Sequence, residues 1–199
     1  MLIGFMVGVF TMNISFTPPI DDPNVDKSSL HIQGIHADED MMEIMEVLGY
    51  VGADITAVET PGIKVTEYAF AIKDGNRRVI GYNKNALELA NNILPYPEER
   101  WCSKWILAHE IGHHLLDHVN NKRLSRRAEE LQADRFAGFV MRLLEADSAE
   151  AVFVVKNIIF DSDLDYPPTY DREEYILKGW NEAQEYINLL TNQELQLKL

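Results

Sequence analysis

Four of the six histidines in this chain fall within ten residues, between His109 and His118. Three residues of this stretch, His109, Glu110 and His113, form an HExxH pattern inside a segment that favours a helix over 98–119. Residues four apart on a helix differ by about 40° around its axis, so the two imidazoles project from one face. The pattern therefore requires a helix here, and it predicts that the histidine face meets a second element of the fold.

The chemistry of this face suits a metal ion. Two neutral imidazoles suit Zn²⁺, which accepts nitrogen ligands in tetrahedral geometry. Glu110 is rotated about 100° from His109 on the helix, so it can reach a metal-bound water without taking a metal site itself. The apolar residues Ile106, Leu107 and Ile111 flank the motif and predict a low-dielectric wall. The alternative is a helix whose two histidines only pack or face solvent.

A catalytic zinc needs a third protein ligand and one open position. The single cysteine, Cys102, excludes an internal disulfide and a cysteine-based metal cage, so a carboxylate is the candidate. A second helix, predicted over 125–145 with a serine cap, offers Glu129, Glu130 and Asp134. Glu130 and Asp134 lie four apart on one face. We expect Glu130 to be a ligand, Asp134 to accept the spare N–H of a ligating imidazole, and Glu129 to be solvated.

The other two histidines of the cluster, His114 and His118, are also four residues apart. On a continuous helix they are rotated about 140° from His109 and His113, respectively. We therefore expect them to face away from the metal and to serve as surface or packing residues.

Hydrophobic periodicity and turn residues predict an α+β fold with a small sheet and mostly helices. The expected elements are a helix over 37–51, a strand over 55–59, a hairpin over 68–82 with Asp74 and Gly75 at its turn, and helices over 86–93, 98–119, 125–145, 148–159 and 171–190. Asp171 and Glu174 suggest a capping box at the start of the last helix.

The amino-terminal part of the chain differs from the rest. Residues 1–36 read as an apolar segment followed by a linker, and residues 37–199 as one domain. The apolar run over 2–10 has the length of a signal peptide but is too short to span a bilayer. No Lys or Arg precedes it, so it is either a signal whose basic start is missing or a segment that packs on the domain. We favour export, for example to the periplasm, with a cytoplasmic location as the alternative.

Charge excludes some classes of partner. The chain has 18 Lys plus Arg against 32 Asp plus Glu, a formal net charge of −14. Duplex DNA and anionic membranes are polyanions, so we expect no nucleic-acid partner. We also expect no integral membrane span.

The stretches ILAHEIGHHLLDH (106–118) and ELQADRFAGFVM (130–141) resemble the gluzincin metallopeptidases, and most closely the compact members of the HtpX-like peptidase family that lack membrane helices. The resemblance covers about residues 68–183 and is strongest at these two stretches. It implies a zincin-like fold, a small sheet with its hairpin packed on a predominantly helical catalytic domain. It also implies one Zn²⁺ bound by His109, His113 and Glu130, with Glu110 as the general base and Asp134 behind the ligands.

The family also carries a His-Pro element followed by an arginine. The corresponding residues here are Tyr166, which stands where histidine is usual, and Arg172, so the resemblance implies both as candidate donors to the reacting oxyanion. The implied function is a zinc metalloendopeptidase that hydrolyses peptide or protein substrates, bound along the edge of the hairpin 68–82. The alternative is a regulatory interaction protein that keeps the zinc-binding fold, binds a regulatory partner and cleaves little.

Overall fold

The structure is a computed structural model that describes residues 39–49, 55–60, 68–94, 99–121, 123–158 and 166–197. The segment over 1–36, on which the predictions about export depend, lies outside these ranges. In chain order the elements are α1 (Glu39–Val47), β1 (Ile55–Glu59), β2 (Ala69–Asp74), β3 (Arg77–Tyr82), α2 (Lys84–Asn91), α3 (Trp101–Leu115), α4 (Arg126–Leu143), α5 (Ser148–Asn157) and α6 (Thr169–Leu197). A small sheet and a majority of helices confirm the α+β prediction.

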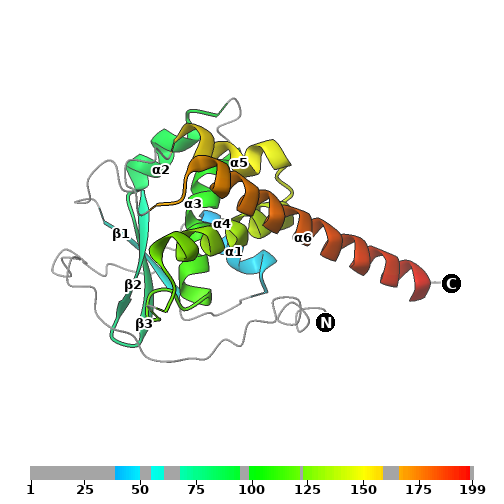
Figure 1. Ribbon diagram of the computed structural model, residues 1–199, viewed down its shortest axis with the longest axis horizontal. Coiled ribbons are helices and arrows are strands. Elements are labelled where there is room, and N and C mark those ends of the chain that lie inside the picture. The colour runs from blue at the N-terminus through cyan, green and yellow to red at the C-terminus, as the bar shows by residue number, and fades with distance from the viewer. Residues whose placement is uncertain are drawn as a thin grey trace.

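The three strands form one mixed sheet in the order β1-β3-β2. Strand β1 runs parallel to β3, and β2 pairs antiparallel to β3 as the predicted hairpin. Gly75 occupies the hairpin turn with a φ of 61°, a left-handed conformation that glycine adopts without steric penalty. Figure 1 shows the strands at one side of the helices. In the described part of the chain, the strand order makes β2 an edge strand, and β2 lies against α3.

The core is built around α3, whose residues Leu107, Ala108 and Ile111 are fully buried. The burial of these apolar side chains agrees with the predicted low-dielectric surroundings of the HExxH pattern. Helix α4 packs on α3 and also on α6, which starts close to the sheet and extends beyond the other helices in Figure 1. Helix α4 thus joins α3, which carries the histidines, to α6.

Helices α4 and α6 approach each other at two glycines. A Cβ added to Gly138 would lie 2.0 Å from the carbonyl oxygen of Ile176, and one added to Gly179 would lie 1.8 Å from that of Arg135. No side chain fits at such distances, so glycine is required at both positions. The close approach places the start of α6 directly against the part of α4 that carries the predicted carboxylates.

Helix α3 is shorter than the predicted helix over 98–119 at both ends. It begins after Arg100, which has a φ of 57° and whose guanidinium pairs with the buried Asp40 of α1. It ends at Leu115, because Asp117 takes a φ of 61°. The amides of Asp117 and His118 donate to the carbonyls of His114 and His113, at 3.3 and 2.9 Å, respectively.

These two backbone hydrogen bonds define how α3 ends. This pattern is a Schellman motif, in which a left-handed residue ends the helix and the next amide turns back to the last turn. The chain therefore leaves the helix before His118. The prediction that the helix continues through His118 to residue 119 is wrong.

The last helix also differs from its prediction. Helix α6 begins at Thr169, two residues before Asp171, and continues to Leu197 rather than ending near residue 190. The amide of Arg172 donates to the carbonyl of Pro168, so the first turn already includes Asp171. The predicted capping box of Asp171 and Glu174 is therefore wrong. The Asp171 carboxylate instead pairs with Arg127 of α4.

The caps of the other helices follow local sequence. Ser125 caps α4 as predicted, since its side chain accepts the amide of Ala128. Asp147 and Glu150 form a capping box at the start of α5. None of the helices in the described ranges is both long and apolar enough to cross a membrane.

Candidate metal centre

Two helices bring three potential metal ligands together. His109 and His113 come from α3 and Glu130 from α4, and one ligand atom from each lies within 4.8 Å of the others. The Nε2 atoms of the two histidines are 3.1 Å apart. Glu130 Oε2 lies 3.2 Å from His109 Nε2, and Glu130 Oε1 lies 3.8 Å from His113 Nε2. This group could hold a metal ion.

The spacing of the three ligands fits a tetrahedral ion. With metal–ligand distances of about 2.0–2.2 Å, the ligand atoms of a tetrahedral site lie about 3.3–3.6 Å from one another. The two imidazole nitrogens, 3.1 Å apart, and Glu130 Oε2, 3.2 Å from His109 Nε2, lie just below that range, and the other carboxylate oxygen, Oε1, lies 3.8 Å from His113 Nε2, just above it. Two imidazoles and one carboxylate are also a donor set that zinc accepts, and three protein ligands leave a fourth position open.

The pKa values of the three ligands also favour a positive charge at this site. Burial lowers the pKa of His109, but the hydrogen bonds and charges of Asp134 and Glu130 outweigh burial and raise the pKa to about 10. Burial and then the neighbouring His109 hold the pKa of His113 well below its usual value, so this imidazole is neutral. Burial raises the pKa of Glu130, but the hydrogen bond and charge of His109 outweigh it and lower the pKa overall. Glu130 therefore stays ionised. His113 and Glu130 are thus in the protonation states that metal ligands require, whereas His109 holds a proton that a metal ion would displace.

Behind His109 lies a buried ion pair. His109 Nδ1 is 3.0 Å from Asp134 Oδ1, in ion-pair contact rather than in a well-aligned hydrogen bond. Arg172 donates two hydrogen bonds to the same carboxylate, Nε to Oδ2 at 2.7 Å and Nη2 to Oδ1 at 2.8 Å. Asp134 and Arg172 are both almost completely buried. Asp134 therefore lies beside His109 Nδ1, as predicted. Arg172 is paired with Asp134, a contact that the sequence did not predict.

Trp105 completes the surroundings of His109. Its ring stacks on the imidazole with centroids 5.2 Å apart and an interplanar angle of 26°, and the Arg172 guanidinium lies 5.8 Å from its centre. Sequence reasoning missed this residue. The available signal was its position four residues before His109, on the same helix face.

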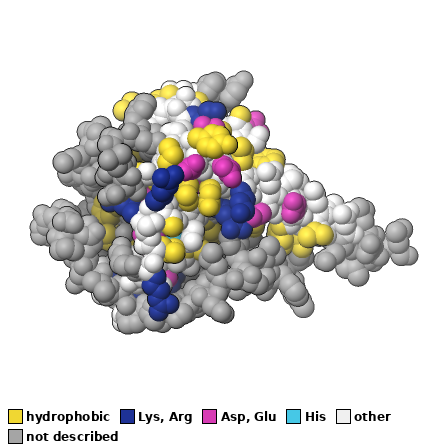
Figure 2. Space-filling model, viewed as in Figure 1, with side chains coloured by type: hydrophobic (Ala, Val, Ile, Leu, Met, Phe, Trp, Pro, Cys, Tyr) yellow, Lys and Arg dark blue, Asp and Glu magenta, His cyan; other side chains and the backbone are white. Residues whose placement is uncertain are grey.

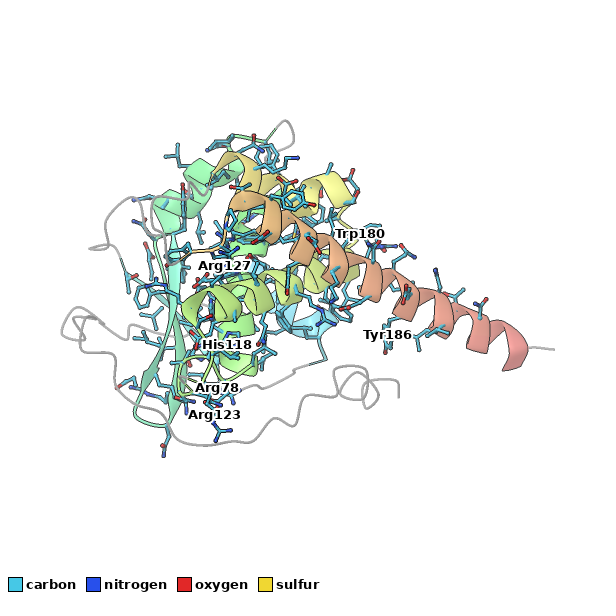
Figure 3. The ribbon with its side chains drawn as sticks, viewed as in Figure 1. Arg78, His118, Arg123, Arg127, Trp180 and Tyr186 are labelled. Atoms are coloured by element: carbon cyan, nitrogen blue, oxygen red, sulfur yellow. The ribbon has the colours of Figure 1, made fainter. Side chains whose placement is uncertain are left out.

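Behind His113 lies a second histidine. His118 Nδ1 is 3.1 Å from His113 Nδ1, and the two rings meet edge-on at 72°. On its other side, His118 Nε2 is 3.0 Å from the Gln132 amide oxygen of α4. Figure 3 shows His118 near the lower end of α3. His118 is a buried packing residue, as expected, but it does not face away from the site.

His114 follows its prediction more closely. It is 3% exposed, and its Nε2 lies 3.0 Å from the backbone carbonyl of Val79 in β3. It therefore joins α3 to the sheet, away from the three ligands. Glu129 does not follow its prediction, because it is buried rather than solvated. No described histidine is visible on the face drawn in Figure 2, where basic, acidic and apolar side chains are interspersed.

Glu110, the middle residue of the HExxH pattern, faces the sheet edge. Its half-buried carboxylate accepts a hydrogen bond from the backbone of Ala71 in the edge strand β2. Burial raises the pKa of Glu110 to about 7, against the lowering effects of His109, Ala71 and Arg172. A carboxylate with this pKa can both accept and return a proton near neutral pH.

Tyr166 lies just before α6. Its hydroxyl accepts a hydrogen bond from Arg126, and the Arg126 guanidinium lies 4.3 Å from the centre of its ring. Burial and then the charge of Glu130 raise the pKa of Tyr166, so the hydroxyl keeps its proton. The electrostatic coupling to Glu130 and Glu110 puts Tyr166 near the ligands. Arg126 was not predicted as part of this group, and no motif in the sequence points to it.

Comparisons with protein-family models, with curated proteins and with solved structures found no match for this chain. The chemistry of the site therefore rests on its own residues.

Proposed function

We propose that this protein is a zinc-dependent metalloendopeptidase with a zincin-like catalytic domain of the gluzincin type, similar to the HtpX-like peptidases. The observation that carries the proposal is the group of His109, His113 and Glu130, whose charges act on the neighbouring carboxyl of Glu110. A structural zinc site would be closed by four protein ligands, usually from cysteine or histidine. Three ligands with an adjacent proton acceptor are instead typical of hydrolytic zinc sites.

His109, His113 and Glu130 would hold the zinc ion. When bound, zinc supplies Lewis acidity, which makes water more acidic and polarises a peptide carbonyl. Glu110 accepts the proton that water loses and returns it to the leaving amine. Its pKa of about 7 suits both steps. The Ala71 backbone holds its carboxylate beside the edge strand.

Tyr166 is the candidate donor to the developing oxyanion. Arg126 donates to the tyrosine oxygen, so the phenolic proton is left to point elsewhere. Arg172 donates hydrogen bonds to both oxygens of Asp134, so it is better suited to holding this carboxylate than to contacting substrate. The role of Arg172 is therefore positional in this proposal.

The edge strand β2 supports an extended peptide as the substrate. It has β3 on one side only within the described sheet, and Ala71 on this strand contacts Glu110. A peptide can add to such an edge as a further strand through backbone hydrogen bonds. A peptide bound there would pass beside Glu110.

The experiment that tests the proposal compares Glu110→Gln with wild type in casein digestion. We expect wild type to cleave casein, a chelator to abolish cleavage and added zinc to restore it. Glu110→Gln should retain zinc but lose about 10²–10⁴-fold in rate, the range of general acid–base catalysis. Glu129→Gln, on a neighbouring carboxylate outside the ligand group, is the matched control and should keep its activity. Zinc binding without cleavage by wild type would favour the regulatory interaction protein instead.

A further inference from the structure

His118 has a defined place beside the ligand His113 that the proposed function does not use. The Schellman motif at the end of α3 turns the His118 amide back to the His113 carbonyl, at 2.9 Å. In this motif the residue after the left-handed position commonly makes an apolar contact with the last helical turn. Here that contact joins two imidazoles, His118 Nδ1 and His113 Nδ1, at 3.1 Å.

One set of hydrogen-bond directions satisfies His113, His118 and Gln132 together. A ligand to a metal at His113 Nε2 needs a lone pair on that atom, so a neutral His113 carries its proton on Nδ1. That proton can be donated to His118 Nδ1 only if His118 carries its own proton on Nε2. The Gln132 amide oxygen, 3.0 Å from His118 Nε2, accepts a proton and so favours this tautomer.

We propose that His118 is a positioning residue of the metal centre, which accepts the Nδ1–H of His113 and thereby keeps the Nε2 lone pair of His113 directed at the metal. Gln132 fixes the tautomer of His118 from the other side. Ligating histidines generally donate their second N–H to a carboxylate, a carbonyl or water, and loss of such a partner weakens metal binding about 10–100-fold. The acceptor in this protein is a second neutral imidazole.

Burial supports this role. His118 is 3% exposed, so water does not readily replace it as the acceptor for His113. Its contacts join the turn after α3 to α4, the helix that also carries Glu130. A shift of His118 would therefore disturb the orientation of one ligand while leaving the other two in place.

The experiment measures zinc affinity of the purified full chain by competition with a chromophoric chelator. His118→Leu removes the acceptor and should weaken zinc binding about 10–100-fold. His118→Asn can place its amide oxygen near the position of Nδ1 and should stay within about threefold of wild type, since the acceptor is retained. His114→Leu is the matched control, because His114 is equally buried in the same segment but bonds to Val79. It should lower stability without changing zinc affinity.

A second measurement applies even if the leucine variants fail to fold. In ¹⁵N-histidine NMR spectra of zinc-loaded wild type, we expect His118 as the Nε2–H tautomer and His113 with its proton on Nδ1. The inference is overturned if His118 is the Nδ1–H tautomer, if folded His118→Leu binds zinc like wild type, or if His114→Leu weakens binding as much. The inference rests on the proposed zinc site: absence of zinc from wild type would refute that site, whereas zinc binding insensitive to His118 would refute the positioning role alone.

Discussion

The two histidine ligands on α3 are supported in different ways, although they lie one helical turn apart. Behind His109 is an ion pair, Asp134 with Arg172, which is contributed by α4 and α6 and is almost completely buried. Behind His113 is an uncharged group, His118 with a glutamine, which depends on the turn that follows α3. The first support depends on how two helices pack, and the second on where one helix ends.

This difference predicts how substitutions behind each histidine affect the protein. Removal of one partner from a buried ion pair is strongly destabilising, because the other charge stays buried and unpaired. A neutral hydrogen-bonded pair leaves a smaller penalty when it is broken. Changes on the His109 side should therefore affect mainly folding, and changes on the His113 side mainly metal binding.

The largest expected effect comes from breaking the ion pair. Arg172→Leu leaves the buried Asp134 carboxylate without its arginine, and we expect the free energy of unfolding to fall by about 3–5 kcal/mol. Arg135→Leu is the matched control, since Arg135 also bonds to a carboxylate across α4 and α6, that of Glu182, but is partly exposed. It should cost at most about 1 kcal/mol. Equal losses in urea denaturation would contradict the difference.

The next effect tests the packing beneath the ion pair. Gly179→Ala forces a methyl group against the Arg135 carbonyl, at 1.8 Å, so α6 must move away from α4. We expect a loss of about 1–3 kcal/mol, typical of overpacking. Gly75→Ala, whose added Cβ meets nothing within 4 Å, should cost only about 1–2 kcal/mol for its left-handed backbone. Zinc binding distinguishes the two variants more sharply than stability does. Gly179→Ala should weaken it, because α6 supports the His109 side, and Gly75→Ala should not.

A substitution in the turn tests the His113 side. Asp117 has a φ of 61°, which a β-branched residue adopts poorly, so Asp117→Val should lower stability by about 1–2 kcal/mol. It should also weaken zinc binding, because the turn sets the position of His118. Asp117→Gly is the control, because glycine accepts this conformation and keeps the turn. A valine variant with unchanged zinc affinity would separate the turn from the metal centre.

The smallest effect concerns Cys102, on α3 but in the apolar core. Its thiol is fully buried, and burial raises the pKa to about 12. The unfolded chain loses this proton near pH 8.5 while the native protein keeps it, so stability is complete below that pH and falls above it. Between pH 7.5 and 9.5, wild type should lose about 1 kcal/mol relative to Cys102→Ala. A difference between the two proteins that does not change with pH would contradict this, whatever its size.

Local signals in the sequence predicted much of the fold. The hairpin turn at Gly75, the cap at Ser125 and the α+β class all follow from residues close together in the chain. The group of His109, His113 and Glu130 could also be predicted, because helical spacing and a second helix with carboxylates are both visible in the sequence.

Other features depend on contacts that a pattern cannot show. Asp117 is an uncommon left-handed helix terminator, so the early end of α3, and with it the place of His118, could not be read from spacing. The burial of Arg172 depends on the close approach of α6 to α4 at two glycines. Glu129 was predicted to be solvated because a charged residue usually is, but tertiary packing buries it.

The most direct test of the central claim is the zinc content of the purified chain together with its zinc X-ray absorption spectrum. We predict one zinc per chain, with nitrogen and oxygen neighbours at about 2.0–2.2 Å. Glu130→Ala should lose the metal, and Glu129→Gln should keep it. No zinc in wild type after incubation with zinc, or loss of zinc from Glu129→Gln but not from Glu130→Ala, would contradict the account.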